Sequence, residues 1–171
     1  MRGLGTAVNV ATVLAGTAVG LLVGARLPDR LRATLLSGVG LVVLVIGFDQ
    51  ARATRNVIFP LVAIVLGGLI GELIDIEGRL DRLGERLRAR FASGEEHDRF
   101  VEGFVTASLV FCVGPLTVLG AVQDGLHAEH QLLFVKAGLD GLVALVLAST
   151  LGWGVGLSAV VILLYQGALT A

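Results

Sequence analysis

The stretch FCVGPLTVLGAVQDG, residues 111–125, decides how the fourth hydrophobic segment of this chain folds. It begins as an apolar run typical of a membrane helix, but Gly114 and Pro115 interrupt it, and the polar Gln123 and Asp124 follow. A proline inside a helix removes a backbone hydrogen bond and clashes with the carbonyl one turn back, at a cost of about 3 kcal/mol or more. We therefore expect this helix to be broken near Gly114 and Pro115.

The composition indicates a membrane protein. Hydrophobic residues make up 55% of the 171 residues and charged residues only 16%, whereas soluble domains carry about 25% charged residues. The mean hydropathy is +0.87. The net charge of −1 gives no basic surface for a nucleic-acid partner. A lone cysteine, Cys112, excludes an intramolecular disulfide and a cysteine-clustered metal site. We expect an all-α, polytopic helix bundle, a single transmembrane domain over residues 1–171 whose surroundings are the lipid bilayer.

Six apolar runs approach the length of about 17–25 residues that a helix needs to cross the hydrocarbon. They lie near 3–25, 34–50, 57–75, 100–122, 132–151 and 153–171. Three runs fall in residues 3–75 and three in residues 100–171. Because each half crosses the membrane an odd number of times, the second half would have the inverted orientation relative to the first. Such 3+3 inverted halves place the binding site at their interface in many transporters, and we take this arrangement as a hypothesis.

The basic residues predict the orientation, because short cytoplasmic loops carry an excess of arginine and lysine. One side of the predicted bundle receives Arg26, Arg30, Arg32, Arg79, Arg82, Arg86, Arg88, Arg90 and Arg99, and the other receives Arg2, Arg52, Arg55 and Lys136. We therefore expect segment 76–99 in the cytoplasm and both termini of this chain outside. Apolar residues recur in that segment at spacings of three and four, which predicts an amphipathic helix on the inner membrane surface.

Polar side chains inside the predicted spans gather at one depth. At 1.5 Å per residue, Asn9, Asp140, Gln166 and the break at Gly114–Pro115 all lie roughly 8–12 Å below the outer ends of their spans. Such groups are costly in lipid and mark a site, a pathway or an internal ion pair. Irregular backbone at membrane depth is tolerated only inside protein or beside a wet cavity. We therefore expect these features to face one another.

The pattern predicts a cation- or substrate-binding site. The candidate residues are Asn9, Val113, Gly114, Pro115, Asp124, Asp140 and Gln166, with the two aspartates as charged groups, the two amides as oxygen donors and the 113–115 backbone as further ligands. Lys136 is one turn from Asp140, where an internal ion pair is geometrically easy and could be purely structural. The alternative for the break is a simple proline kink satisfied by Thr117 or by water.

Motifs for enzymes are absent from the sequence. It contains no Walker A loop, no GxSxG, no HExxH and no dinucleotide fingerprint, so we expect neither an enzyme nor a bound cofactor. His127 and His130 flank Glu129 in a predicted loop, a weak indication of a metal site. We expect no metal centre.

Several segments resemble a known family. They are GTAVNVATVLAG around Asn9, GLIGELIDIEGRLDRLG (68–84), FVEGFVTASLVFCVGPLTVLGAVQDG (100–125), KAGLDG (136–141) and YQGALT (165–170). Over essentially the whole chain, the sequence is similar to the prokaryotic family catalogued as domain of unknown function 554. The resemblance implies an integral membrane protein, and a sodium channel or pump has been suggested for some members. Members usually continue beyond the YQG segment with one or two further apolar segments, which this chain lacks.

Our leading hypothesis is a secondary transporter or channel for a small cation, with sodium as one candidate, in the cell membrane. The alternative is a non-transporting membrane scaffold or accessory subunit whose 76–99 helix recruits a partner. A small-solute carrier is a third reading. A homo-oligomer is compatible with each.

Overall fold

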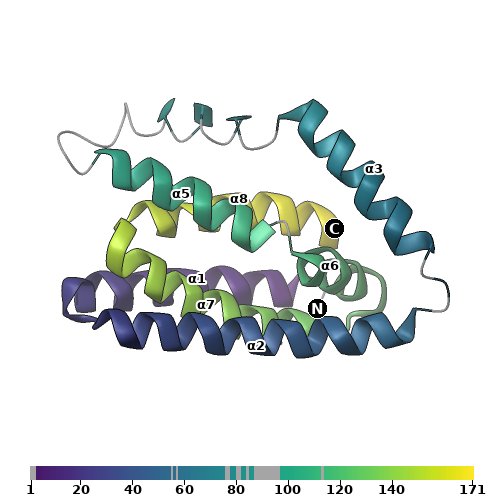
Figure 1. Ribbon diagram of the computed structural model, residues 1–171, viewed down its shortest axis with the longest axis horizontal. Coiled ribbons are helices and arrows are strands. Elements are labelled where there is room, and N and C mark those ends of the chain that lie inside the picture. Colours follow the sequence, from purple (N-terminus) through teal and green to yellow (C-terminus); the bar gives the residue numbers. More distant parts are fainter. Residues whose placement is uncertain are drawn as a thin grey trace.

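The computed structural model describes residues 3–54, 56, 58–75, 78–79, 82–83, 85–86, 97–112 and 114–171. Every regular element within them is helical, which confirms the predicted all-α class. The helices are α1 (Leu4–Val23), α2 (Asp29–Ala53), α3 (Ile58–Ile74), α5 (His97–Cys112), α6 (Pro115–His127), α7 (Gln131–Leu151) and α8 (Gly154–Thr170), and a short 3-10 turn, Gly24–Arg26, follows α1. Figure 1 shows α1, α5, α6, α7 and α8 as a bundle, with α2 along one side.

Helices α1 and α7 form the most closely packed pair of the bundle. A side-chain carbon placed on Gly16 would collide with the carbonyl oxygen of Gly141, and one on Gly20 with that of Leu145. The missing side chains therefore let the two backbones approach closely, which is how helices associate in lipid, where no hydrophobic effect drives them together. The glycine repeat of α1 serves packing inside this chain.

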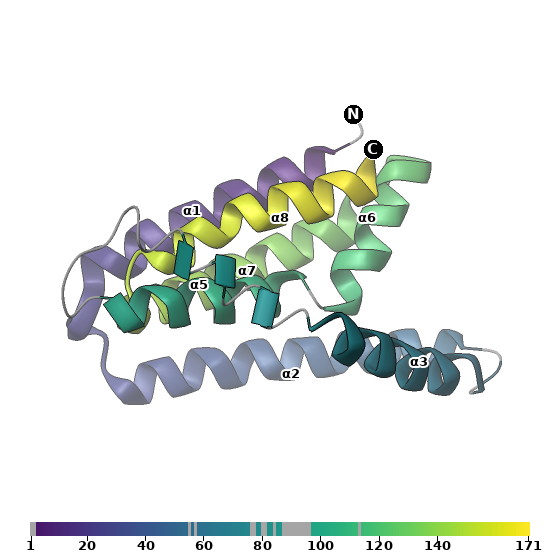
Figure 2. The same ribbon diagram turned by 90° about the horizontal axis from the view of Figure 1, so that it is seen from above.

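Helix α8 returns beside α1 after a tight turn. Gly152 at this turn has a φ of 81°, a left-handed conformation that glycine adopts without steric cost. Helix α8 then packs against α5, α1 and α6, and Thr170 near its end meets Thr6 near the start of α1. The two chain ends consequently lie at the same end of the bundle (Figure 2).

The predicted break in the fourth apolar segment is confirmed. Helix α5 ends at Cys112, α6 begins at Pro115, and the two helices are bent by 56° relative to each other. Proline fits the first position of a helix because the N–H it lacks would have no intrahelical partner there. The Thr117 hydroxyl donates a hydrogen bond to the Phe111 carbonyl at 2.9 Å. Thr117 therefore gives this carbonyl a hydrogen-bond donor at the break, where Pro115 has no N–H to donate.

Candidate membrane spans can be counted among the described residues. Helix α1, residues 29–49 of α2, and α7 are long and apolar enough to cross a membrane, and the bent pair α5–α6 would make a fourth span. Helices α3 and α8 are apolar but have 17 residues each, which corresponds to about 26 Å against a hydrocarbon core of about 30 Å. The total of six spans therefore stays a prediction.

Helix α2 is longer than the run 34–50 that predicted it. It begins at Asp29 and ends at Ala53, because charged residues at its two ends interrupt the hydropathy signal without interrupting the helix. An acidic residue such as Asp29 is favourable in a first turn, and a basic residue such as Arg52 in a last turn. The apolar run thus marks only the middle of the helix.

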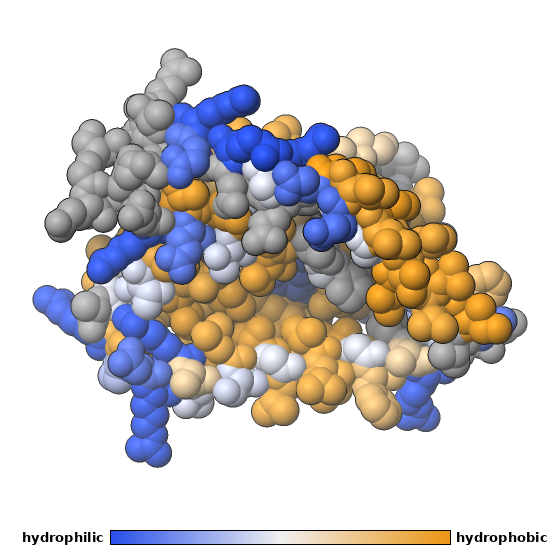
Figure 3. Space-filling model, turned by 45° about the horizontal axis from the view of Figure 1, so that its top comes forward, coloured by the Kyte–Doolittle hydropathy of each residue, from blue (hydrophilic) through white to orange (hydrophobic). Residues whose placement is uncertain are grey.

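The outer surface of the molecule is strongly hydrophobic. Helix α3 has no buried residue, and Figure 3 shows hydrophobic side chains covering it at the right of the view, with hydrophilic residues gathered elsewhere. Such a surface suits contact with lipid chains. In the predicted amphipathic segment 76–99, residues 78–79, 82–83, 85–86 and 97–99 are helical. The rest of that segment lies outside the described residues, so its form stays a prediction.

Candidate functional site

Three of the predicted site residues meet in the interior of the bundle. The Asn9 side-chain amide on α1 donates one hydrogen bond to Asp140 Oδ2 on α7, at 3.0 Å. It donates a second to Gln166 Oε1 on α8, at 3.1 Å. Asn9 and Gln166 are fully buried, and Asp140 is 8% exposed. Groups from three helices that are distant in sequence therefore form one polar cluster, Asn9–Asp140–Gln166.

The Asn9 carbonyl oxygen is the exceptional atom of this cluster. It is buried and has no hydrogen-bond partner among the described residues, although both hydrogens of the same amide are used. A buried acceptor without a partner costs about 1–3 kcal/mol, so each such atom in a native protein calls for an explanation. A ligand with positive charge or with a hydrogen to donate would satisfy this oxygen.

Lys136 forms the expected internal ion pair. Its ammonium contacts Asp140 Oδ2 across one turn of α7, and Lys136 is only 4% exposed. A buried charge is tolerable when it is paired and hydrogen-bonded, and strongly unfavourable when it is alone. The Asp140 carboxylate therefore receives both an ammonium and the Asn9 amide.

The polar cluster continues toward the chain ends through residues that the sequence analysis did not select. The Gln166 side-chain amide donates to the Thr6 hydroxyl at 3.2 Å, and the Thr6 and Thr170 hydroxyls are 3.4 Å apart. Thr170 also donates to the Gln166 backbone carbonyl at 2.8 Å. Threonines are common in membrane helices, so only their spacing of three and four residues from Asn9 and Gln166 could have identified them.

Asp124 does not join this cluster in the structure. It is fully buried near the end of α6, and its Oδ1 lies 2.6 Å from His130 Nδ1 at the start of α7. The contact is close but does not have hydrogen-bond geometry, because His130 Nδ1 and both carboxylate oxygens of Asp124 are buried without a hydrogen-bond partner among the described residues. The sequence analysis placed His130 in a loop and did not predict its contact with the buried Asp124.

The end of the broken helix lies near the polar cluster, although its backbone is partly engaged. Phe111 and Cys112 at the end of α5 belong to the same hydrophobic core cluster as the apolar residues one turn from Asn9, Asp140 and Gln166, which are Val13, Ala144 and Ile162. The Gly114 carbonyl accepts the Thr117 backbone N–H at 3.0 Å. Val113, one of the predicted ligands, lies outside the described residues, and no side-chain contact of Pro115 is described.

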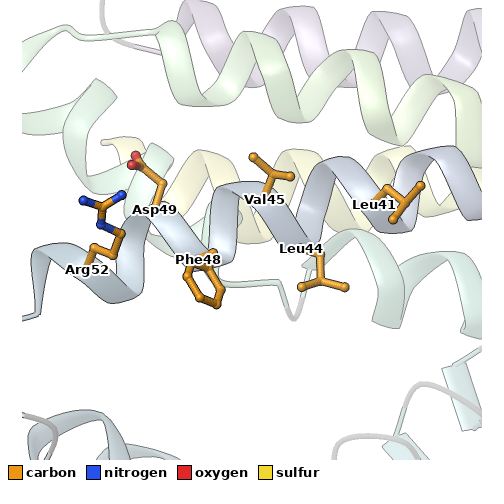
Figure 4. Close-up of a pocket in the computed structure, with 6 residues that line it drawn as sticks. All are labelled: Leu41, Leu44, Val45, Phe48, Asp49 and Arg52. Atoms are coloured by element: carbon orange, nitrogen blue, oxygen red, sulfur yellow. The ribbon is translucent and has the colours of Figure 1, made fainter.

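A pocket on α2 lies elsewhere. It has a volume of about 410 Å³ and is lined by residues of this one helix, Leu41, Leu44, Val45, Phe48, Asp49 and Arg52 (Figure 4). A groove on one exposed, mostly apolar helix face suits a lipid chain better than a polar ligand. The buried polar cluster carries the chemistry that can recognise a charged solute.

Comparison with known proteins identifies a family that includes a membrane protein. The family model described as "Protein of unknown function (DUF554)" matches residues 4–171. The uncharacterized membrane protein YdfK of Bacillus subtilis (strain 168) is 29% identical over 169 residues, which is 96% of this chain and 70% of the relative. The uncharacterized protein YqgA of Escherichia coli (strain K12) is 28% identical over 166 residues, which is 95% of this chain and 71% of the relative. No solved structure matches the chain.

Proposed function

The chain belongs to the membrane-protein family described as Protein of unknown function (DUF554), and from this premise we propose that it moves a small cation across the cell membrane. The Asn9–Asp140–Gln166 cluster is the binding site in this proposal. Asp140 supplies the negative charge, and the side-chain carbonyls of Asn9 and Gln166 supply neutral oxygen. Sodium is the first candidate, because hard cations prefer oxygen ligands.

The observation that carries the proposal is the unpartnered Asn9 oxygen. It is buried beside a carboxylate, in a protein whose surface is otherwise apolar enough for lipid. Other buried polar atoms, among them Thr17 Oγ1 and Ser108 Oγ, also lack a partner among the described residues, but the Asn9 oxygen lies beside the Asp140 carboxylate, where a cation would be favoured. A cation that contacts this oxygen and Asp140 would relieve the cost. It would have to share the carboxylate with the Lys136 ammonium.

The sequence and the broken helix both favour transport that is not driven by ATP. Motifs for ATP-driven transport are absent from the sequence, so movement would occur down a gradient or coupled to one. A discontinuous helix beside buried polar groups is the arrangement that many secondary transporters use at their binding sites. The break between α5 and α6 follows Cys112, which packs in the hydrophobic core cluster one turn from the polar residues, and it supports a secondary transporter over a rigid scaffold.

The orientation in the membrane is part of the proposal. The arginine asymmetry supports segment 76–99 on the cytoplasmic side and both ends of this chain outside. The chain ends lie together at one end of the bundle (Figure 2), as an even number of spans requires. In this orientation Thr6 and Thr170 lie toward the outer surface.

A scaffold or accessory subunit is the second candidate. The observation that favours it is the Lys136–Asp140 pair, which neutralises the buried carboxylate within the chain. In that case the polar cluster would fix the positions of α1, α7 and α8 and would bind no ion. The two candidates differ in whether a monovalent cation stabilises the folded protein.

Thermal unfolding of the purified protein in detergent tests cation binding. The melting temperature is compared in Li⁺, Na⁺ or K⁺ and in N-methylglucamine at equal ionic strength. A ligand that binds only the folded state at 100 times its Kd adds about 2.7 kcal/mol. We expect at least one of the three cations to raise the melting temperature. No effect of any of them would contradict the proposal and support the scaffold.

Two variants make the binding test specific. Asp140→Asn removes the proposed ligand charge while keeping its shape, so the effect of the cation on the melting temperature should disappear. Asp49→Asn makes the same chemical change on the exposed face of α2 and should keep the effect. Loss of the cation effect in both variants would show that it arises from general electrostatics.

A further inference from the structure

The polar cluster has different neighbours on its two sides along the bundle axis. On the side of the chain ends, the residues one turn away on the same three helices are all polar. They are Thr6, three residues before Asn9; Lys136, four residues before Asp140; and Thr170, four residues after Gln166. Helices α1 and α7 run parallel and α8 runs antiparallel to them, as the contacts of Gly5 with Leu133 and of Thr6 with Thr170 require. These three residues therefore lie on one side of the cluster.

On the other side, the corresponding residues are all apolar. They are Val13, four residues after Asn9; Ala144, four residues after Asp140; and Ile162, four residues before Gln166. All three are fully buried and belong to one hydrophobic core cluster, together with Phe111 of α5. A cation cannot pass such a layer without leaving its hydration behind, so the layer closes this side.

The polar side ends in a surface pocket. The pocket has a volume of about 300 Å³ and lies between the first turn of α1 and the last two turns of α8. Among the described residues that line it, only Thr6 and Thr170 have polar side chains. Their hydroxyls are also the outermost members of the hydrogen-bonded row that leads through Gln166 to Asn9 and Asp140.

We propose that this pocket, with the Thr6 and Thr170 hydroxyls at its floor, is an outer cation-binding site and the entrance to the Asn9–Asp140–Gln166 cluster. The hydroxyls replace part of the hydration shell of the cation, and Gln166 and Asn9 receive it in turn. The layer of Val13, Phe111, Ala144 and Ile162 closes the opposite side. This inference rests on the proposed function. In the conformation described here, the cluster would be open toward the end of the bundle where the two chain ends lie.

Thr6 and Thr17 give a matched pair for the test. Both are threonines on α1, and they are 3% and 5% exposed. Thr6 lies at the proposed entrance, and Thr17 lies one turn beyond Val13, behind the hydrophobic layer. Each is changed to cysteine in a Cys112→Ala background, because Cys112 is the sole native thiol. Melting temperatures confirm that both variants fold.

A water-soluble methanethiosulfonate that carries a trimethylammonium group then probes both thiols. We expect Thr6→Cys to react at least tenfold faster than Thr17→Cys, and its modification to abolish sodium uptake into proteoliposomes. Equal rates, or a faster reaction of Thr17→Cys, would overturn the assignment of the entrance. So would full sodium uptake after complete modification of Thr6→Cys.

Failure of the entrance and failure of the proposed function give different results. If the unmodified background protein takes up no cation, the proposed function fails, whatever the two labelling rates are. If that protein takes up sodium while modification of Thr17→Cys blocks uptake and modification of Thr6→Cys does not, the entrance is wrong and the proposed function stands.

Discussion

At the scale of single residues, Asp140 balances two opposing demands. Its carboxylate is nearly buried, and a charge in that position needs close partners, which Lys136 and Asn9 provide. The same carboxylate must stay available if a cation is to bind. The Asn9 oxygen, which has no partner among the described residues, shows that the cluster is satisfied with respect to charge but not with respect to hydrogen bonds.

The ion pair predicts a double-mutant result. Lys136→Met should lower the free energy of unfolding by roughly 3–5 kcal/mol, because it leaves the Asp140 charge buried and unpaired. Adding Asp140→Asn should restore part of this loss, since no buried charge remains. The free energies are measured by titration with SDS. A double variant as unstable as the sum of both single variants would show that the two side chains do not interact.

At the scale of elements, the contact between α1 and α7 depends on glycine. These two helices carry Asn9 and Asp140, and their separation sets the distance between the two side chains. Leu133 of α7 packs directly against Gly5, as Gly141 does against Gly16. Larger residues at these glycines would push the helices apart and open the hydrogen bond from Asn9 to Asp140.

Gly16→Ala tests this dependence, and Gly38→Ala on α2 is the matched control. Alanine is the better helix former by up to about 1 kcal/mol, so a substitution with free space around it should be neutral or stabilising. A side-chain carbon at Gly38 would meet nothing within 4 Å, whereas one at Gly16 would collide with the Gly141 backbone. We expect Gly16→Ala to lower the melting temperature and Gly38→Ala not to. Equal effects of the two changes would disprove the close contact.

At the scale of the whole molecule, the sequence predicted the helical class, the break at Pro115 and the meeting of Asn9, Asp140 and Gln166. The break and the meeting of the three polar residues could be predicted because both arise from large energetic costs. A proline interrupts the hydrogen bonds of a helix, and polar side chains in lipid need polar partners. The link from Asp124 to His130 was not predictable, because α6 and α7 had to be placed before the two could be paired. The roles of Thr6 and Thr170 were hidden because a hydroxyl can also bond to its own helix backbone.

The orientation of the molecule gives a prediction of its own. A single cysteine at Ser93, in a variant without Cys112, should not react with a membrane-impermeant thiol reagent added to intact cells, because segment 76–99 is expected in the cytoplasm. It should react after the cells are opened, which is the control for accessibility. Labelling from outside intact cells would reverse the orientation proposed for the whole chain.

Uptake of radioactive sodium into proteoliposomes tests the central claim, that the Asn9–Asp140–Gln166 cluster binds a transported cation. The account predicts uptake by the wild-type protein above that of protein-free liposomes, unchanged uptake by Asp49→Asn, and uptake by folded Asp140→Asn at the protein-free level. The same rate for Asp140→Asn and the wild type would contradict the assignment of the site. Wild-type uptake equal to that of protein-free liposomes, for sodium and likewise for lithium and potassium, would contradict cation transport itself.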